Sequence, residues 1–276
     1  MTLQVATQPR SQLATLKVRR SITQMSAAEI ARFRKALEGM MARTDNRGYQ
    51  YFAGWHGVPL GICEHHNKLF LPWHRGYLYD FELALQEIDP DVTLPWWNWM
   101  DEPGIPDAYS RARVAGKRNV LTSAPIEPLG IKRRPAWPKR TRRDPGGQVP
   151  GQPAAAPPPL RSFAEWMMSA GSYEEFWNRC ARIHDNVHVW VGGNGGQMAD
   201  PNWAAFDPLF WAHHSMVDRL WRIWQHQNPG AVPDHETQET PLTFAKGPAF
   251  LVRDVLDVKK LGYEYAAQAT TAKGSS

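Results

Sequence analysis

The chain has 276 residues, of which 42% are hydrophobic and 13 are tryptophan, enough for a substantial core with a large aromatic interior. No apolar run approaches the roughly 20 residues that span a bilayer, and two cysteines cannot form a disulfide framework. The composition therefore excludes a transmembrane protein and a disulfide-stapled scaffold, and the net charge of +5 is concentrated in one stretch near the middle.

The amino-terminal sequence MTLQVATQPR lacks the apolar core of a secretory signal. Cys63 and Cys180 are the only cysteines, which suits a reducing compartment. We therefore expect a soluble, unprocessed chain that is located in the cytoplasm and does not bind membranes. Because the most informative residues lie in two distant clusters that would have to converge on one site, we expect residues 1–276 to form a single domain.

Two helices are predicted in the amino-terminal third of the chain. The first covers residues 26–43, because Ser26 and Glu29 have the spacing of a capping box and apolar residues follow at helical period. The second begins near Pro72, a residue suited to the first helical turn, and ends at the Asp-Pro pair at 89–90.

A long proline-rich segment from Leu94 to about Leu160 follows and gives few strand signals. It contains the basic stretch of the chain, which is interrupted by prolines and continues into the sequence DPGGQVPGQPAAAPPPL. We interpret residues 131–160 as a solvated Pro/Gly-rich loop that does not bind nucleic acid. The basic residues of this loop are Lys132, Arg133, Arg134, Lys139, Arg140, Arg142 and Arg143.

Two further helices are predicted beyond this loop. One runs from Ser172 to the glycine pair at 192–193, and the other runs from the Asp-Pro pair at 207–208 to the Asn-Pro-Gly turn at 228–230. The predicted fold class is therefore mainly α, with long loops and little β-structure.

Histidines are concentrated in two short parts of the chain. Eight of the 10 lie within residues 56–74 and 184–214, which together make up less than a fifth of the sequence. Random placement would put about two histidines there, so the clustering indicates a metal site. His184 and His188 lie four residues apart on a predicted helix, so both rings can bind one ion.

An all-imidazole site favours copper, because neutral nitrogen donors bind both of its oxidation states. Two ions, each held by three histidines, can share a substrate oxygen between them. Two helix pairs that supply these ligands would form a four-helix bundle holding a dinuclear copper centre. A zinc hydrolase is an alternative, although the sequence HDNVH lacks the Glu of the zinc protease pattern.

Four segments carry a resemblance to a known family: WHGVP, CEHHNKLFLPWHRGYLYDFE, IHDNVHVWVGG and DPLFWAHHSMVDRLW. They resemble the type 3 copper proteins, which comprise tyrosinases, catechol oxidases and molluscan-type haemocyanins. The resemblance implies two copper ions, with dioxygen as co-substrate, and two sets of three histidine ligands. These are His56, His65 and His74 for the first copper, and His184, His188 and His214 for the second.

Neighbours of these histidines are expected to support them. Asp218 follows His214 by four residues and can hydrogen-bond the other nitrogen of that ring, which favours His214 over His213 as the ligand. Phe70 and Phe210 lie next to ligands, where they can pack the helices and wall the site.

Cys63 stands two residues before His65, as in the Cys-x-His of fungal tyrosinases and haemocyanins. The resemblance implies a thioether bond between the Cys63 sulfur and the His65 ring. A buried free thiol is the alternative.

The resemblance covers about residues 18–265. Arg19, Arg20 and the sequence YEY at 263–265 look like the amino-terminal arginine of the family and the tyrosine motif that closes its core domain. We expect one of these arginines to contact the tyrosines, since a guanidinium can stack on or hydrogen-bond to a phenol ring. Residues 266–276 would form a short flexible tail.

The activity implied by the resemblance is oxidation of small phenols by dioxygen to ortho-quinones, with monophenols, diphenols or both as substrates. Glu175 and Asp185 stand where tyrosinases have the residues thought to orient a water that takes the phenol proton, although Glu175 also has capping-box spacing with Ser172. The alternatives are a catechol or ortho-aminophenol oxidase without monophenolase activity and a haemocyanin-like oxygen carrier. The oligomeric state and a copper-delivery partner are left open.

Overall fold

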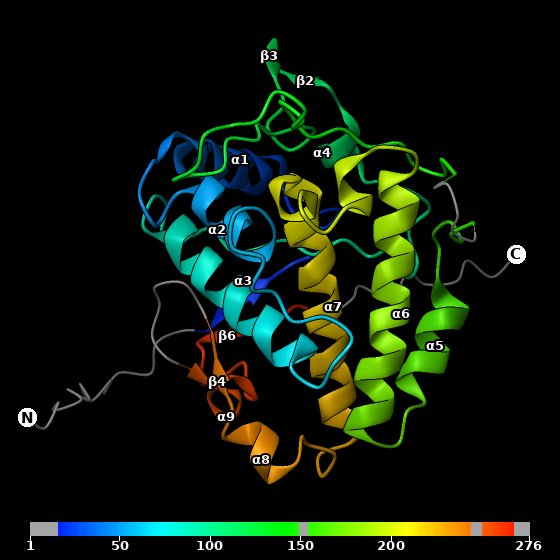
Figure 1. The fold of residues 1–276 in the computed structure, drawn as a ribbon. Coiled ribbons are helices and arrows are strands. Elements are labelled where there is room, and N and C mark those ends of the chain that lie inside the picture. The colour runs from blue at the N-terminus through cyan, green and yellow to red at the C-terminus, as the bar shows by residue number, and fades with distance from the viewer. Residues whose placement is uncertain (1–15, 149–153, 244–249, 268–276) are drawn as a thin grey trace, which may run out of the picture.

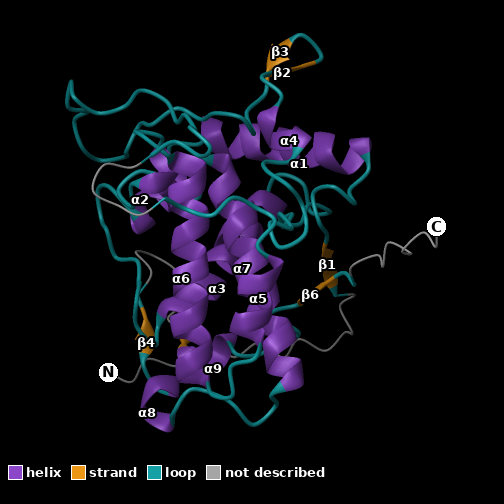
Figure 2. Ribbon diagram, turned by 90° about the vertical axis from the view of Figure 1, so that its right-hand side faces the viewer, coloured by secondary structure: helices purple, strands orange, loops and turns teal. Residues whose placement is uncertain are grey.

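A computed structural model of the protein describes residues 16–148, 154–243 and 250–267. The amino-terminal sequence MTLQVATQPR, positions 149–153 of the predicted loop and most of the predicted tail lie outside the described residues. Helices predominate in the described part, where strands occur only as three short pairs (Figures 1 and 2). The expected mainly helical fold is confirmed. No helix of the described residues is both long enough and apolar enough to cross a membrane.

The elements follow one another along the chain with long connections between them. The helices are α1 (Ala27–Ala42), α2 (Tyr49–His56), α3 (Phe70–Gln86), α4 (Asp107–Ser110), α5 (Arg161–Met168), α6 (Tyr173–Gly192), α7 (Pro208–Gln227), α8 (His235–Gln238) and α9 (Val252–Val255), with 3₁₀ turns η1 (Gln197–Ala199) and η2 (Ala204–Phe206) before α7. The strands are β1 (Lys17–Arg19), β2 (Arg113–Val114), β3 (Lys117–Arg118), β4 (Pro241–Leu242), β5 (Phe250–Leu251) and β6 (Tyr263–Tyr265). β1 pairs in parallel with β6, whereas β2 with β3 and β4 with β5 are antiparallel.

Predicted capping signals mark the starts of three of the helices. Ser26 accepts the Glu29 N–H at the start of α1, and the Glu29 carboxylate accepts the Ser26 N–H in return, which completes the capping box. Ser172 and Asp207 accept backbone hydrogen bonds at the starts of α6 and α7, and Pro208 occupies the first position of α7.

The start of α3 and two unpredicted helices lack such caps. α3 begins at Phe70, so Pro72 is its third residue, where the missing N–H costs nothing because the first N–H groups of a helix have no partner inside it. α2 and α5, which the sequence pattern did not predict, follow Gly48 and Leu160, neither of which caps its helix with a side chain.

Helices α2, α3, α6 and α7 form the four-helix core, and α5 lies along the outside of α6 (Figure 1). Aromatic rings fill the space between the core helices. Phe81 of α3 stacks on Trp211 of α7 with ring centroids 3.5 Å apart, and Phe52 of α2 packs edge-on against Phe81 at 5.4 Å. This close packing fixes the helices relative to one another, and with them the side chains that they carry.

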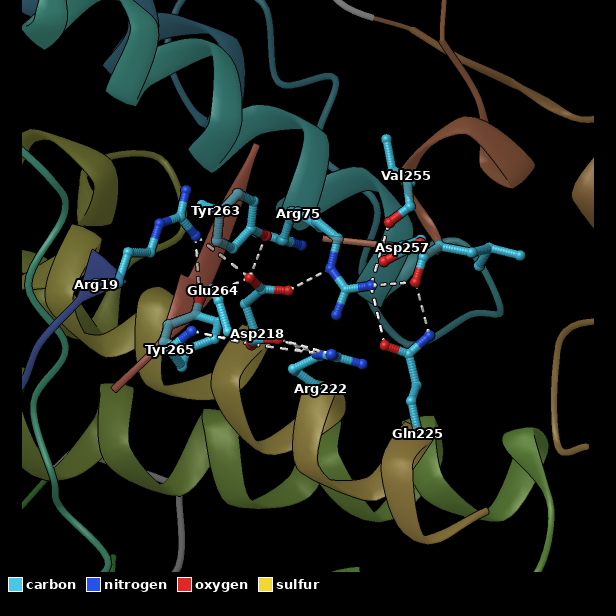
Figure 3. A network of polar contacts seen from close by, with 12 residues as sticks. Arg19, Arg75, Asp218, Arg222, Gln225, Val255, Asp257, Tyr263, Glu264 and Tyr265 are labelled. Atoms are coloured by element: carbon cyan, nitrogen blue, oxygen red, sulfur yellow. Dashed lines mark hydrogen bonds and ion pairs between the residues drawn. The ribbon is translucent and has the colours of Figure 1, made fainter. Parts of the chain in front are cut away.

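The two ends of the described chain meet beside α7, where β1 pairs with β6 (Figure 3). Arg19 lies 3.7 Å from the centroid of the Tyr263 ring, donates to the Tyr265 hydroxyl at 3.0 Å and pairs with Glu82 of α3 at 2.8 Å. The expected contact between an amino-terminal arginine and the tyrosine motif is confirmed. Arg19 makes this contact, whereas Arg20 is exposed.

The basic stretch is only in part the solvated loop that its composition predicts. The Arg143 side chain is only 7% exposed and pairs with Asp207, the capping residue of α7, at 2.5 Å, because a buried carboxylate requires a compensating charge. Arg142 donates to the carbonyl of Gly195 at 3.0 Å. The carboxyl-terminal cations thus attach the loop to the core, while residues 131–139 are largely exposed.

Candidate metal centre

The first set of predicted ligands comes from α2, α3 and the loop between them. His56 is the last residue of α2, His65 lies in the loop, and His74 is the fifth residue of α3. The Nε2 atoms of His56 and His65 are 3.2 Å apart, and the His74 ring centroid lies 5.7 Å and 5.2 Å from those of His56 and His65. The Nε2 atom of His74 is buried and has no hydrogen-bond partner among the described residues.

The second set comes from α6 and α7. His184 and His188 lie one turn apart on α6 with ring centroids 4.4 Å apart, and His214 faces them from α7. Nε2 of His214 lies 3.2 Å from Nε2 of His184 and 3.2 Å from Nε2 of His188. The rings therefore converge through the same nitrogen.

The two sets touch each other. The rings of His74 and His214 stack with centroids 4.5 Å apart, and ligand atoms of His56, His74 and His214 all lie within 4.8 Å of one another. Two groups of three imidazoles thus stand side by side inside the four-helix core, which is the arrangement that a dinuclear centre requires.

Backbone carbonyls determine the tautomers of three of these rings. Each ring donates from Nδ1 to the carbonyl of a residue near the site: His56 to Pro201 at 3.2 Å, His74 to Phe70 at 2.8 Å and His188 to Met198 at 2.8 Å. A carbonyl can only accept, so Nδ1 carries the proton and Nε2 keeps a lone pair directed into the centre.

The facing nitrogens of the second set fit a metal ion better than they fit one another. His184 donates from Nδ1 to the Asp185 carboxylate at 2.9 Å, so His184 and His188 both direct an Nε2 lone pair at Nε2 of His214. His214 has one proton and can donate from Nε2 to only one of them. A cation between the three rings would satisfy all of their lone pairs, so the donor set fits a bound metal.

Burial lowers the pKa of all six rings, because an apolar interior disfavours the charged imidazolium. The pKa values of His65 and His188 fall to about 4, and those of the other four fall well below the usual range. The rings are therefore neutral at pH 7, which is the form that binds metals.

Phe70 and Phe210 each touch both sets. The Phe70 ring centroid lies 5.0 Å from His74 and 5.0 Å from His184. The Phe210 ring centroid lies 4.8 Å from His56 and 4.1 Å from His214. Both phenylalanines are fully buried, so they cover one part of the converging imidazoles with apolar surface.

A cavity of about 370 Å³, here called the histidine cavity, opens onto the imidazoles. Its size lies in the range of small-molecule sites. It reaches the surface, because the side chains of His66 and Asp185 on its wall are 66% and 41% exposed. Its walls consist of His56, His65, His66, His184, Asp185, His188, Val189, Met198, Ala199, Pro201 and Ala204.

Asp185 lines the histidine cavity beside the predicted ligand His184. One carboxylate oxygen, Oδ1, accepts from His184, and the other, Oδ2, lies 3.3 Å from Nε2 of His66. Burial raises the pKa of this carboxyl, although the nearby His66 acts in the opposite direction.

Glu175 lies elsewhere, in the first turn of α6. Its carboxylate accepts the Gly171 N–H at 2.9 Å and lies 3.5 Å from the Arg179 guanidinium. The position is roughly 13 Å of helix rise before His184, and Glu175 is not among the residues that line the histidine cavity. The geometry gives Glu175 a role at the start of α6, although its carboxylate accepts from the Gly171 N–H and not from that of Ser172 as in a capping box. It gives no support to a catalytic role.

The expected hydrogen bond between Asp218 and His214 is wrong. Oδ1 of Asp218 accepts from Nε of Arg75 at 2.5 Å, and Oδ2 accepts from the hydroxyls of Tyr263 and Tyr265, each at 2.6 Å (Figure 3). Nδ1 of His214 has no hydrogen-bond partner among the described residues. The carboxylate turns to the guanidinium because a charged donor binds it more strongly than a neutral imidazole N–H does.

The Cys63 thiol donates to the carbonyl of His56 at 2.9 Å. Its sulfur and a ring nitrogen from each of His56 and His65 lie within 4.8 Å of one another. Burial raises the pKa of the thiol to about 11. The thioether to His65 stays a prediction, with the sulfur already beside that ring.

Two other features surround the ligands. His213 is fully buried beside the second set, where ligand atoms of His184, His188, His213 and His214 all lie within 4.8 Å of one another. Neither nitrogen of His213 has a hydrogen-bond partner among the described residues. The carbonyls of Met198 and Pro201, which orient His188 and His56, were missed by sequence reasoning. Every residue type carries a carbonyl, so the sequence contains no signal for this role.

Known proteins are similar to this chain. A family model described as the common central domain of tyrosinase matches residues 46–227, more than half of the chain. The chain belongs to the tyrosinase family. Two copper ions are therefore its cofactor, and the two sets of histidines fit that cofactor.

Individual relatives agree with this placement. A tyrosinase from Streptomyces glaucescens is 32% identical over 184 residues, which cover 60% of this chain and 66% of the relative, just under two thirds of its length. The structure of a tyrosinase from Burkholderia thailandensis has a TM-score of 0.75 at 23% identity and covers 92% of this chain and 74% of its own. The structure of a functional unit from octopus hemocyanin has a TM-score of 0.75 at 24% identity, and the match covers 91% of this chain and 68% of the hemocyanin chain. The two structures show a shared fold.

Proposed function

We propose that this member of the tyrosinase family oxidises small phenols with dioxygen to ortho-quinones. The observation that supports the proposal is the histidine cavity, in which neutral imidazoles of both sets face an open space of about 370 Å³. An oxygen carrier needs the two sets of histidines alone, whereas an oxidase also needs room for the phenol ring beside them.

In this proposal His56, His65 and His74 hold one copper, and His184, His188 and His214 hold the other. When bound, the copper pair supplies the redox chemistry by which dioxygen is reduced and the phenol is oxidised. The chain contributes the orientation of the imidazoles and the apolar surface that Phe70 and Phe210 provide.

Asp185 is the residue proposed to take the proton of the phenol hydroxyl. Its Oδ1 is engaged by His184, so the proton would go to Oδ2, the oxygen that faces His66. A raised pKa makes this carboxylate a stronger base than an ordinary aspartate. We therefore propose monophenols as well as catechols as substrates, since monophenols depend more on a nearby base.

Reconstitution with copper tests the function. Initial rates of oxygen uptake and quinone formation should be measured with 4-methylphenol, 4-methylcatechol and 2-aminophenol. We expect activity on the first two. Protein that binds two copper ions but oxidises none of the three compounds would contradict the proposal and favour an oxygen carrier, whereas activity on the last two alone would identify a catechol or aminophenol oxidase.

A variant of Asp185 tests the assigned base. Asp185→Asn keeps an acceptor for His184 but cannot take a proton, so we expect the rate on 4-methylphenol to fall at least tenfold, about 1.4 kcal/mol of barrier, with a much smaller loss on 4-methylcatechol. Glu175→Gln is the matched control and should leave both rates unchanged. Equal losses on both substrates in Asp185→Asn would show that the carboxylate only supports the ligand.

The location of the protein is also a proposal. Cys63 and Cys180 are not joined by a disulfide, which supports the cytoplasmic location expected from the sequence. Fractionation of the source cells, with activity measured in each fraction, tests it.

A further inference from the structure

We propose that a second cavity beside the histidine cavity binds the anionic group of the substrate, so that phenols with a carboxylate-bearing side chain are preferred. The catalytic part of this inference rests on the proposed function, whereas the binding part does not. This second cavity, here called the basic cavity, has a volume of about 500 Å³. It is lined by Val58, Pro59, Ile131, Lys132, Arg134, Trp137, Asn202 and Trp203.

One stretch of chain separates the two cavities. Pro201 and Ala204 line the histidine cavity, whereas Asn202 and Trp203, the residues between them, line the basic cavity. The carbonyl of Pro201 accepts Nδ1 of His56, so the separating stretch is in direct contact with a predicted ligand. Pro201 and Asn202 are exposed, which leaves a passage over this stretch for a substituent several atoms long.

The basic cavity combines an aromatic floor with positive charge. Trp137 and Trp203 pack edge-on with ring centroids 5.3 Å apart, and the Arg134 guanidinium lies 5.6 Å from the Trp137 ring centroid. Arg133 donates to the carbonyl of Trp137, which holds the loop in this shape. Lys132 and Arg134 are thereby placed on the wall of the cavity.

These two cations are not compensated. Among the described residues, no carboxylate forms an ion pair with Lys132 or Arg134, although other exposed arginines such as Arg32 and Arg111 have such partners. The sequence contains no acidic residue from position 128 to position 143. Two uncompensated cations next to tryptophan rings favour a ligand that has a negative charge and apolar surface.

A phenol with a carboxylate on a short carbon chain has the chemistry to use both cavities. Its ring would occupy the histidine cavity, its chain would cross the exposed stretch at Pro201 and Asn202, and its carboxylate would meet Lys132 and Arg134. A substrate with an ammonium group at the same distance would be repelled. The basic cavity therefore selects the charge of the substituent and takes no part in the oxidation itself.

Steady-state kinetics of the copper-loaded protein test the catalytic part. The substrates are 3-(3,4-dihydroxyphenyl)propanoate, neutral 4-methylcatechol and dopamine. In the double variant Lys132→Gln with Arg134→Gln, we expect KM for the carboxylate substrate to rise about tenfold, with kcat and the KM for 4-methylcatechol changed less than about twofold, since only charge-assisted contacts are lost. Lys139→Gln, which removes a cation of the same loop outside the cavity, should change none of these values. Equal effects on the neutral and the anionic substrate would overturn the proposal.

Calorimetric titration of copper-free protein with 3-phenylpropanoate tests binding without catalysis. We expect the parent protein and Lys139→Gln to bind it and the double variant to lose most of the affinity. Unchanged affinity in the double variant would overturn the proposal that the basic cavity binds the carboxylate, even if the protein oxidises catechols. Conversely, if the copper-loaded parent oxidises no phenol but this titration gives the expected result, the proposed function fails and the anion site stands.

Discussion

Helix α7 carries two buried polar clusters that lie one turn apart and differ in how their atoms are satisfied. Around Asp218, both carboxylate oxygens accept strong hydrogen bonds, from Arg75 on one side and from Tyr263 and Tyr265 on the other. Around His214, ring nitrogens face one another at 3.2 Å, and its own Nδ1 has no partner among the described residues.

This difference separates a structural cluster from a functional one. The carboxylate of Asp218 is satisfied without any added group: although burial acts to raise its pKa, the charges of Arg75 and Arg19 lower it. It therefore stabilises the fold by itself. The His214 cluster lacks partners for its lone pairs and is destabilising until a metal ion binds.

Removal of the Asp218 carboxylate should give the largest loss of stability. Asp218→Ala leaves the buried guanidinium groups of Arg19 and Arg75 without their counter-charge, and breaking a buried ion pair in this way costs about 3–5 kcal/mol. Chemical unfolding of the copper-free protein measures the change. Asp45→Ala, which removes the exposed partner of Arg43, should have little effect, and equal losses in the two variants would contradict a structural role for the network.

Removal of a ligand histidine should lower copper binding and activity but leave the folding stability largely unchanged. We expect His188→Ala and His74→Ala to lose at least one of the two copper ions and all quinone formation, while the copper-free protein unfolds with no large loss of free energy. Elemental analysis after copper loading gives the metal content. His226→Ala, an exposed histidine near the end of α7, is the control and should keep both ions. Full copper content in both ligand variants would refute the assignment.

The stability of the copper-free protein should depend on pH through the buried rings. The pKa values of His65 and His188 are about 4 in the folded chain because burial disfavours the charge, whereas the unfolded chain takes up protons near pH 6.5. The free energy of unfolding should therefore be highest above about pH 6.5 and fall as the pH is lowered toward 4. His188→Ala should make this fall shallower. A flat profile between pH 7 and pH 5 would show that the rings keep their ordinary pKa values.

The smallest predicted change is the loss of two hydrogen atoms in the thioether between Cys63 and His65. His65 makes no hydrogen bond through Nδ1 to a described residue, so a covalent link would orient this ring in place of the carbonyls that orient His56 and His74. Intact mass of the copper-loaded protein measures the loss. Cys180 serves as the control, because it should be alkylated after unfolding, and a Cys63 that is alkylated equally well would rule out the bond.

Sequence reasoning succeeded where residue types leave local signals. The starts of α1, α6 and α7 were predictable because Ser26, Ser172 and Asp207 cap them with side chains. α2 was not predictable, since Gly48 offers no side-chain cap and the helix is only 8 residues long. The six convergent histidines were found because imidazole clusters are rare, and their spacing matches a family.

Partners that depend on the tertiary fold were not predictable. Asp218 and His214 share a helix face, but the spacing along α7 gives no information about Arg75, which comes from α3 and takes the carboxylate. The same limit applies to Arg143, whose place beside Asp207 depends on how a long loop returns to the core. Charge patterns and hydrophobic periodicity in the sequence describe one segment at a time. They cannot predict these contacts, because each contact joins segments that are distant in the sequence.

The stretch that contains Met198 and Pro201 has a consequence for engineering this protein. Its backbone carbonyls orient His188 and His56, one ligand of each set, while the side chains of Met198, Ala199 and Pro201 line the histidine cavity. A saturation library at positions 198 and 199 would therefore vary the shape of the substrate cavity without deleting any group that orients a ligand, because all twenty residues supply the same carbonyl. Selection for new substrates can therefore begin at these two positions.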